Sequence, residues 1–207
     1  MKARTLLYGF VVAAAMVLLV GQVASVALDR SGMSDQELLE AVKGYSKVGK
    51  MHRALTKIKP RNQQIIKWWP SPGAQPRESE SRSDSQWILG SRFLTQTIRG
   101  DWLGIKFETY AILGYDNATQ EYQLVWMSDQ GTHMAFSHGK ADSTGQTLTF
   151  HGEIYDPIDE KTKNVKIVFQ ILNKKGDTLF TVYDVSSPDR EFKFLEVEST
   201  RFIARGA

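Results

Sequence analysis

The side chains best suited to metal binding or proton transfer in this sequence are its histidines. There are four: His52, His133, His138 and His151. If the segments flanking the turn at 143–145 pair as a hairpin, His133 and His151 share one face, whereas His138 lies on the opposite, apolar face with Phe136. Only two histidines then meet, whereas a zinc site needs three or four converging ligands. The sequence therefore predicts no metal site.

A pair of carboxylates could act as general acid and general base. The acidic residues considered for this role are Asp129, Asp142, Glu153, Asp156, Asp159 and Glu160. All except Glu153 lie near turns, where hydrogen bonding to the backbone already favours acidic residues. No serine lies in a Gly-x-Ser-x-Gly elbow, and no glycine-rich phosphate loop follows a strand. We therefore predict no catalytic residue and no cofactor, and a hydrolase is only the third hypothesis for function.

Nine aromatic residues and one histidine occupy positions at which they could line an apolar cavity. They are Trp87, Phe93, Phe107, Tyr110, Trp126, Phe136, His138, Phe150, Phe169 and Phe194. The alternative is that these side chains only fill the core. A β-barrel of eight strands just fills its interior or holds one small ligand, and ten strands leave more room. We also expect Trp126 and Phe194 to be buried, because each occupies an apolar position in a strand that also carries polar residues.

The elements that position these residues alternate between apolar and polar side chains from Pro60 onward, which is typical of strands. The predicted strands are 65–69, 78–89, 92–100, 104–115, 120–128, 132–140, 146–154, 163–172, 177–186 and 190–203. The breaks between them carry turn residues, such as Gly90-Ser91 and Asp116-Asn117. None is long enough for the crossover that parallel pairing needs. We therefore predict a mainly β domain at 60–207, a single antiparallel up-and-down β-barrel of about ten strands.

Residues 29–59 are predicted to form a helical linker of one or two short helices. Ser34 and Glu37 have the spacing of a capping box, and apolar residues follow at helical spacing. Glycines interrupt the middle of the segment, and Pro60 ends it. We expect the part near Met51 to dock on the barrel.

Residues 1–28 form a third region, predicted as a hydrophobic helix. Lys2 and Arg4 precede a run without charge, of which 6–28 is long enough to span a bilayer. A cleaved signal peptide and an uncleaved anchor both fit this pattern. Either one places the barrel on the extracytoplasmic side, in the periplasm or at the cell exterior. The membrane is thus the expected partner of residues 6–28.

Charge and composition exclude several classes of protein. The net charge of the 207 residues is +3, and Lys2 and Arg4 supply two of those charges. The remaining basic residues are interleaved with acidic ones, so we predict no nucleic-acid partner. The absence of cysteine excludes disulfides and a thiol nucleophile.

Several segments, in order and spacing, resemble an uncharacterised bacterial family, domain of unknown function 1579, from His52 to the C-terminus. The segments are Ser71-Pro72-Gly73-Ala74, Ile88-Leu89-Gly90-Ser91-Arg92-Phe93-Leu94, Ile112-Leu113-Gly114-Tyr115-Asp116-Asn117-Ala118-Thr119, Trp126, Gly131-Thr132 and Ser199-Thr200-Arg201. The resemblance implies a calycin or lipocalin-like barrel and no established activity.

One departure from that family concerns the floor of the barrel. Its members usually carry Gly-x-Trp on the first strand, where the Trp closes the floor near an Arg of the last strand. Here positions 60–62 are Pro, Arg and Asn, whereas Arg201 is retained. Either Trp68 or Trp69 supplies the floor, or this barrel closes differently.

The leading hypothesis is a non-enzymatic extracytoplasmic protein that binds a small apolar or amphipathic ligand. The alternative is a structural or protein-interaction module of the cell envelope, for which the sequence identifies no protein partner.

Overall fold

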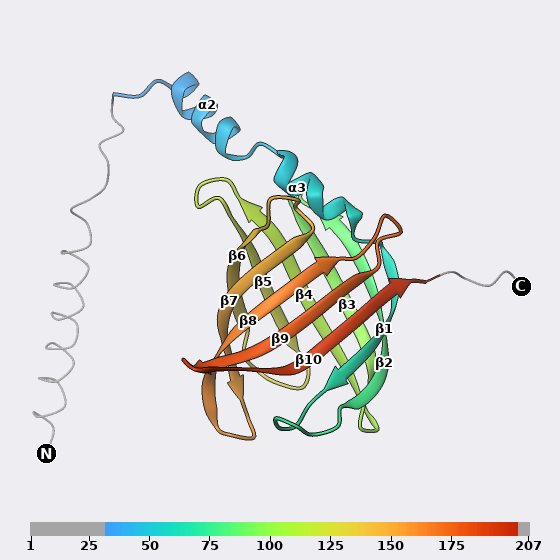
Figure 1. Cartoon of the computed structure of the whole chain (residues 1–207). Coiled ribbons are helices and arrows are strands. Elements are labelled where there is room, and N and C mark those ends of the chain that lie inside the picture. Colours follow the sequence, from blue (N-terminus) through green and yellow to red (C-terminus); the bar gives the residue numbers. More distant parts are fainter. Residues whose placement is uncertain (1–31, 203–207) are drawn as a thin grey trace, which may run out of the picture. The chain divides into compact units, whose positions relative to one another are not determined.

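Ten antiparallel strands form a closed barrel in the computed structural model, which describes residues 32–202 (Figure 1). The strands are β1 (Arg61–Trp68), β2 (Arg77–Ile88), β3 (Phe93–Trp102), β4 (Ile105–Asp116), β5 (Glu121–Ser128), β6 (Ala135–Ala141), β7 (Thr147–Asp156), β8 (Lys161–Ile171), β9 (Thr178–Ser187) and β10 (Arg190–Arg201). Each strand pairs with its neighbours in sequence, and β1 closes the barrel by pairing with β10. The predicted ten-stranded antiparallel meander is confirmed.

Between residue 32 and the barrel, the helices are α2 (Asp35–Tyr45), α3 (Lys50–Ala54) and the 3-10 turn η2 (Leu55–Lys57). The described residues divide into two units, with the boundary between Gly44 and Tyr45. In α2 the predicted capping box is present: the Ser34 amide donates to the Glu37 carboxylate at 2.8 Å, and the Glu37 amide donates to the Ser34 hydroxyl at 3.3 Å. No residue of α2 is buried.

The predicted hydrophobic helix at residues 1–28 lies outside the described residues. Among residues 32–202, no helix is both long and apolar enough to cross a membrane.

One end of the barrel, here the α3 end, is covered by α3 and η2. Leu55 is 1% exposed and belongs to the core, and the Tyr122 hydroxyl donates to the Met51 carbonyl at 3.0 Å. His52 is buried with its ring edge against Tyr115, and its Nδ1 accepts the Gly49 amide at 3.2 Å. These contacts dock the segment around Met51 on the barrel.

Neither Trp68 nor Trp69, which lie at the other end of β1, makes the floor of the barrel at the α3 end. Asn62 holds the first inward position of β1, where it is buried and donates from its amide to the Lys59 carbonyl at 3.1 Å. Trp68 lies six residues further along β1, about 20 Å away, where its ring packs edge-on against Trp102. Of the two alternatives, the barrel closes differently, with Leu55 and Ile58 in the core at the α3 end.

The most tightly packed part of the core is a row across neighbouring strands, here the packed row. Tyr122, Phe150, Ile167 and Val182 are at most 1% exposed. Strand register runs from Tyr122 through Gly139 to Phe150, then to Ile167 and Val182. Gly139 has no side chain, and the backbone of Thr149 and Phe150 in β7 approaches closely at this point of the row.

The direction of β6 differs from the sequence prediction. Ala135 and Ser137 are buried, whereas Phe136 is 60% exposed and His138 is also exposed. His138 therefore lies on the outer wall, where it pairs with His151, and not on the inner face as predicted. The prediction was wrong because the inward residues of β6 are the small ones: a side chain at Gly139 would come within 1.9 Å of the Thr149 carbonyl oxygen.

Candidate ligand-binding cavity

The barrel encloses a cavity of about 530 Å³. It is lined from eight strands, all except β2 and β6, and extends from Ile58 at the α3 end to Pro157 in the turn between β7 and β8. That turn lies at the opposite end of the barrel, here the far end (Figure 1). Pockets for small molecules usually measure about 300–1,000 Å³, so the cavity has the size for one small ligand.

Half of the residues predicted to line a cavity do so. They are Phe107, Trp126, Phe150, Phe169 and Phe194. Phe150 is 1% exposed, whereas Trp126 and Phe194 are half-buried. The expectation that Trp126 and Phe194 are buried therefore holds only in part, because both rings face open space inside the barrel.

The other five predicted residues do not line the cavity. Trp87 packs against the core cluster. Phe93 pairs with Gly114 on the outer face, whereas the neighbouring Leu94 and Leu113 line the cavity. The outward-facing residues are Tyr110, Phe136 and His138. For Tyr110 the reason is strand alternation, since its neighbours Thr109 and Ala111 line the cavity.

Four polar residues form a second row, here the polar row, across β9, β10, β1 and β2. Thr178 pairs with Ser199, Ser199 with Gln64, and Gln64 with Ser81. All four are between 3% and 6% exposed. The Gln64 amide donates to the Ser199 hydroxyl at 3.0 Å and accepts from the Ser81 hydroxyl at 3.0 Å. The side chain of Gln64 is thus held in place from both sides.

The polar row contributes Thr178, Ser199 and Gln64 to the wall of the cavity. The remaining polar lining residues are Gln96, Thr109 and Gln130. None of the described residues that line the cavity is Asp, Glu, Lys, Arg or His. The wall therefore offers uncharged hydrogen-bonding groups in an otherwise apolar surface.

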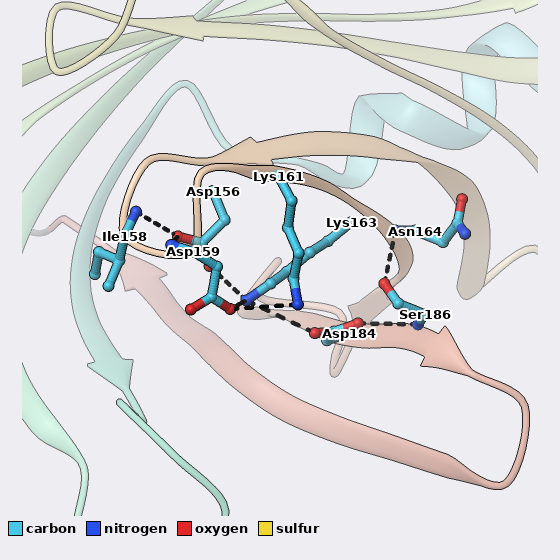
Figure 2. Close-up of polar contacts among 8 residues, drawn as sticks. All are labelled: Asp156, Ile158, Asp159, Lys161, Lys163, Asn164, Asp184 and Ser186. Atoms are coloured by element: carbon cyan, nitrogen blue, oxygen red, sulfur yellow. Dashed lines mark hydrogen bonds and ion pairs between the residues drawn. The ribbon is translucent and has the colours of Figure 1, made fainter.

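A cluster of charged residues lies at the far end, beside Pro157. Figure 2 shows Lys163 of β8 reaching Asp156 and Asp159, with Asp184 of β9 on its other side. The Lys163 ammonium lies 2.7 Å from Asp159 and 3.9 Å from Asp184, and its side chain is 16% exposed. Burial lowers the pKa of Lys163, but its hydrogen bonds to Asp156 and Asp159 outweigh burial and hold that pKa above its ordinary value.

The same contacts act on the carboxylates. Burial raises the pKa of Asp156, but the hydrogen bonds from Lys163 and from the Ile158 and Asp159 amides prevail and keep that pKa below its ordinary value. The positive charge of Lys163 is therefore balanced by nearby carboxylates, and Asp156 stays ionised.

The remaining histidines lie on the outside of the barrel. The Tyr155 amide donates to His133, whose ring also contacts the Tyr155 ring. His138 and His151 face one another on neighbouring strands. Across the described part of the chain, no three His, Cys, Asp or Glu residues converge as metal ligands.

Sequence reasoning missed the polar row. Gln64 lies before the predicted first strand, and its hydrogen bond to Ser199 joins residues 135 positions apart, so no local pattern relates the two. One usable signal was the run of alternate serines in β2, Ser79, Ser81 and Ser83, which indicates a polar inner face.

One family profile, described as "Protein of unknown function (DUF1579)", matches residues 47–201. This match confirms the resemblance predicted from the sequence, and it begins at the segment that docks on the α3 end. No curated protein matches the chain.

Proposed function

Since the chain belongs to the DUF1579 family, whose description assigns no function, we propose from its cavity that it is a non-enzymatic binding protein for one small apolar or amphipathic molecule. The observation that carries the proposal is a cavity of about 530 Å³ with walls that are mostly aliphatic and aromatic. Apolar surface of a ligand gains about 25 cal/mol for each Å² removed from water, so such walls favour apolar ligands.

The test is to fill the cavity in the full-length chain. Ala111 lines the cavity at its middle strands, so Ala111→Phe should occupy ligand space. We expect this variant to weaken binding of an uncharged naphthalene dye, N-phenyl-1-naphthylamine, at least tenfold by fluorescence titration.

A matched control adds the same ring outside the barrel. Gln123 is exposed on β5, so Gln123→Phe should leave dye binding unchanged. Absence of dye binding to the unmodified chain, or equal loss in both variants, would contradict the proposal.

The proposed location is extracytoplasmic, with residues 6–28 as membrane anchor or signal peptide. The support is the uncharged run after Lys2 and Arg4. Fractionation of cells that express the full chain tests it. Membrane association that resists alkali supports the anchor, a mature N-terminus near Leu28 supports the signal peptide, and recovery of the uncleaved chain in the cytoplasm contradicts both.

A protein-interaction role is a second proposal, supported by apolar side chains on the outer wall. Met134, Phe136, Tyr155 and Ile158 are 55%, 60%, 47% and 77% exposed, and the first three border a groove of about 830 Å³. Phe136→Asp should abolish crosslinking to an envelope protein while dye binding persists. Unchanged crosslinking would contradict this role.

A further inference from the structure

We propose that the cavity selects a neutral amphiphile, whose uncharged hydroxyl, carbonyl or amide group lies against Thr178, Ser199 and Gln64. This inference rests on the proposed function and adds the chemical class of the ligand. It starts from the polar row, whose members lie in register and are all at least nine-tenths buried.

The polar row offers hydrogen bonds that its own contacts do not use up. Gln64 donates one amide hydrogen to Ser199, and its amide oxygen accepts from Ser81. Neither bond uses its second amide hydrogen. The Ser199 hydroxyl accepts from Gln64, and its own hydrogen can still be donated. Thr178 adds a third hydroxyl to the cavity wall. A ligand atom here can therefore accept from two or three donors.

The same position disfavours a charged group. No residue with an ionisable side chain is among the described residues that line the cavity. Burying a carboxylate or ammonium without a partner of opposite charge costs several kcal/mol of free energy. Hydrogen bonds to neutral groups compensate for only part of that cost. An ionic headgroup would have to remain in water outside the cavity and could not use the polar row.

The charged cluster at the far end does not change this result. Lys163 is the partly buried cation beside Pro157, and Asp156, Asp159 and Asp184 already surround it. An anionic headgroup would have to compete with three carboxylates for this ammonium. The hydrocarbon part of a neutral ligand instead has Ile66, Val197, Phe180 and Trp68 along the rest of the wall.

A matched series of twelve-carbon compounds tests the inference on the full-length chain in detergent-free buffer at neutral pH. 1-Dodecanol, dodecanoate and dodecylammonium each compete with N-phenyl-1-naphthylamine. We expect dodecanol to bind about tenfold more tightly than either ion, the effect of one hydrogen bond of about 1.4 kcal/mol.

The variants locate the selecting group. Gln64→Leu should remove the preference for the alcohol, whereas Gln96→Leu should keep it, because Gln96 lines the cavity away from the polar row and donates to Ser85. If Gln64→Leu does not fold, Thr178→Val removes a hydroxyl with little change of shape and should reduce the preference by about threefold or more.

The outcomes separate this inference from the proposed function. Equal affinity for dodecanol and dodecanoate, or a preference unchanged in both polar-row variants, overturns the neutral-ligand inference while dye binding leaves the proposed function intact. Failure of the dye and of all three compounds to bind overturns both.

Discussion

The packed row and the polar row are nearly equally buried, yet the first fills the core and the second contributes to the cavity wall. Tyr122, Phe150, Ile167 and Val182 are at most 1% exposed, and the four polar-row residues are 3% to 6% exposed. The packed row places large apolar side chains against one another beneath the Tyr122 contact with α3. Three members of the polar row, Thr178, Ser199 and Gln64, place two hydroxyls and one amide beside open space. Burial alone therefore does not identify the residues that stabilise a barrel.

Side-chain volume and hydrogen-bonding capacity explain this difference. A large apolar side chain gains free energy from each neighbour it contacts, so removing it leaves a void. The polar row gains little net free energy from bonds that replace bonds to water. We therefore expect substitutions in the packed row to lower stability, and substitutions in the polar row to change mainly which ligand binds.

The largest effect should come from Ile167→Ala in the packed row. Ile167 is fully buried, so truncation leaves a void and should lower the free energy of unfolding by about 2–5 kcal/mol. Urea denaturation followed by tryptophan fluorescence measures the change.

The matched control for Ile167→Ala is Ile98→Ala, the same truncation at the cavity wall. Ile98 is only half-buried and already adjoins open space, so its loss should cost less than about 2 kcal/mol. Equal losses in the two variants would mean that the barrel interior is uniformly packed.

The second largest effect concerns charged side chains and compares a partly buried cluster with an exposed ion pair. Lys163→Met removes the cation that Asp156, Asp159 and Asp184 share, and the half-buried carboxylates of Asp156 and Asp184 lose their partner. We expect a loss of about 1–3 kcal/mol at neutral pH. The loss should shrink in acid, where Asp156 takes up a proton more readily without Lys163.

An exposed ion pair provides the control for Lys163. Arg99 and Glu108 pair at 2.6 Å, but their side chains are 59% and 51% exposed. Arg99→Gln should change stability by less than about 1 kcal/mol. Thermal unfolding of both variants tests the contrast, which fails if Arg99→Gln costs as much as Lys163→Met.

The strands were predictable from the sequence because their period and turn residues are local. Nine of ten predicted strands overlap the observed ones along most of their length, and β1 differs most, since it begins at Arg61 instead of residue 65. Its first residues include Asn62 and Gln64, which are polar but face inward. Alternation of polarity cannot detect a strand whose inner face begins polar.

The candidate site was predictable only in part. Phe107, Trp126, Phe150, Phe169 and Phe194 follow the usual rule that aromatic residues face inward. In β6 that rule fails, because the backbone of β7 at Thr149 and Phe150 lies so close to Gly139 that no side chain fits there. The strand that must carry small inward residues is determined by the register of all strands across the barrel. The sequence of a single strand does not contain this information.

The smallest predicted effect on stability concerns His52, which belongs to α3. Burial is the main cause that lowers the pKa of His52, and the nearby Arg92 lowers it further, so the folded pKa lies below the ordinary value of 6.5. A hydrogen bond with the Tyr115 backbone opposes this shift, and Arg53 adds to it. The neutral ring is also the form whose Nδ1 can accept the Gly49 amide.

The sign of the pH dependence follows from this lowered pKa. As the pH falls through 6.5, His52 takes up a proton in the unfolded chain but stays neutral in the folded chain. The free energy of unfolding therefore decreases until the pH reaches the folded pKa. For one group the slope is at most about 1.4 kcal/mol per pH unit. Urea midpoints between pH 7.5 and 5.5 should fall for the unmodified chain and much less for His52→Gln. His151→Gln, at an exposed position, should keep the original slope. A slope that is unchanged in His52→Gln would place the titrating group elsewhere and leave the α3 end independent of pH.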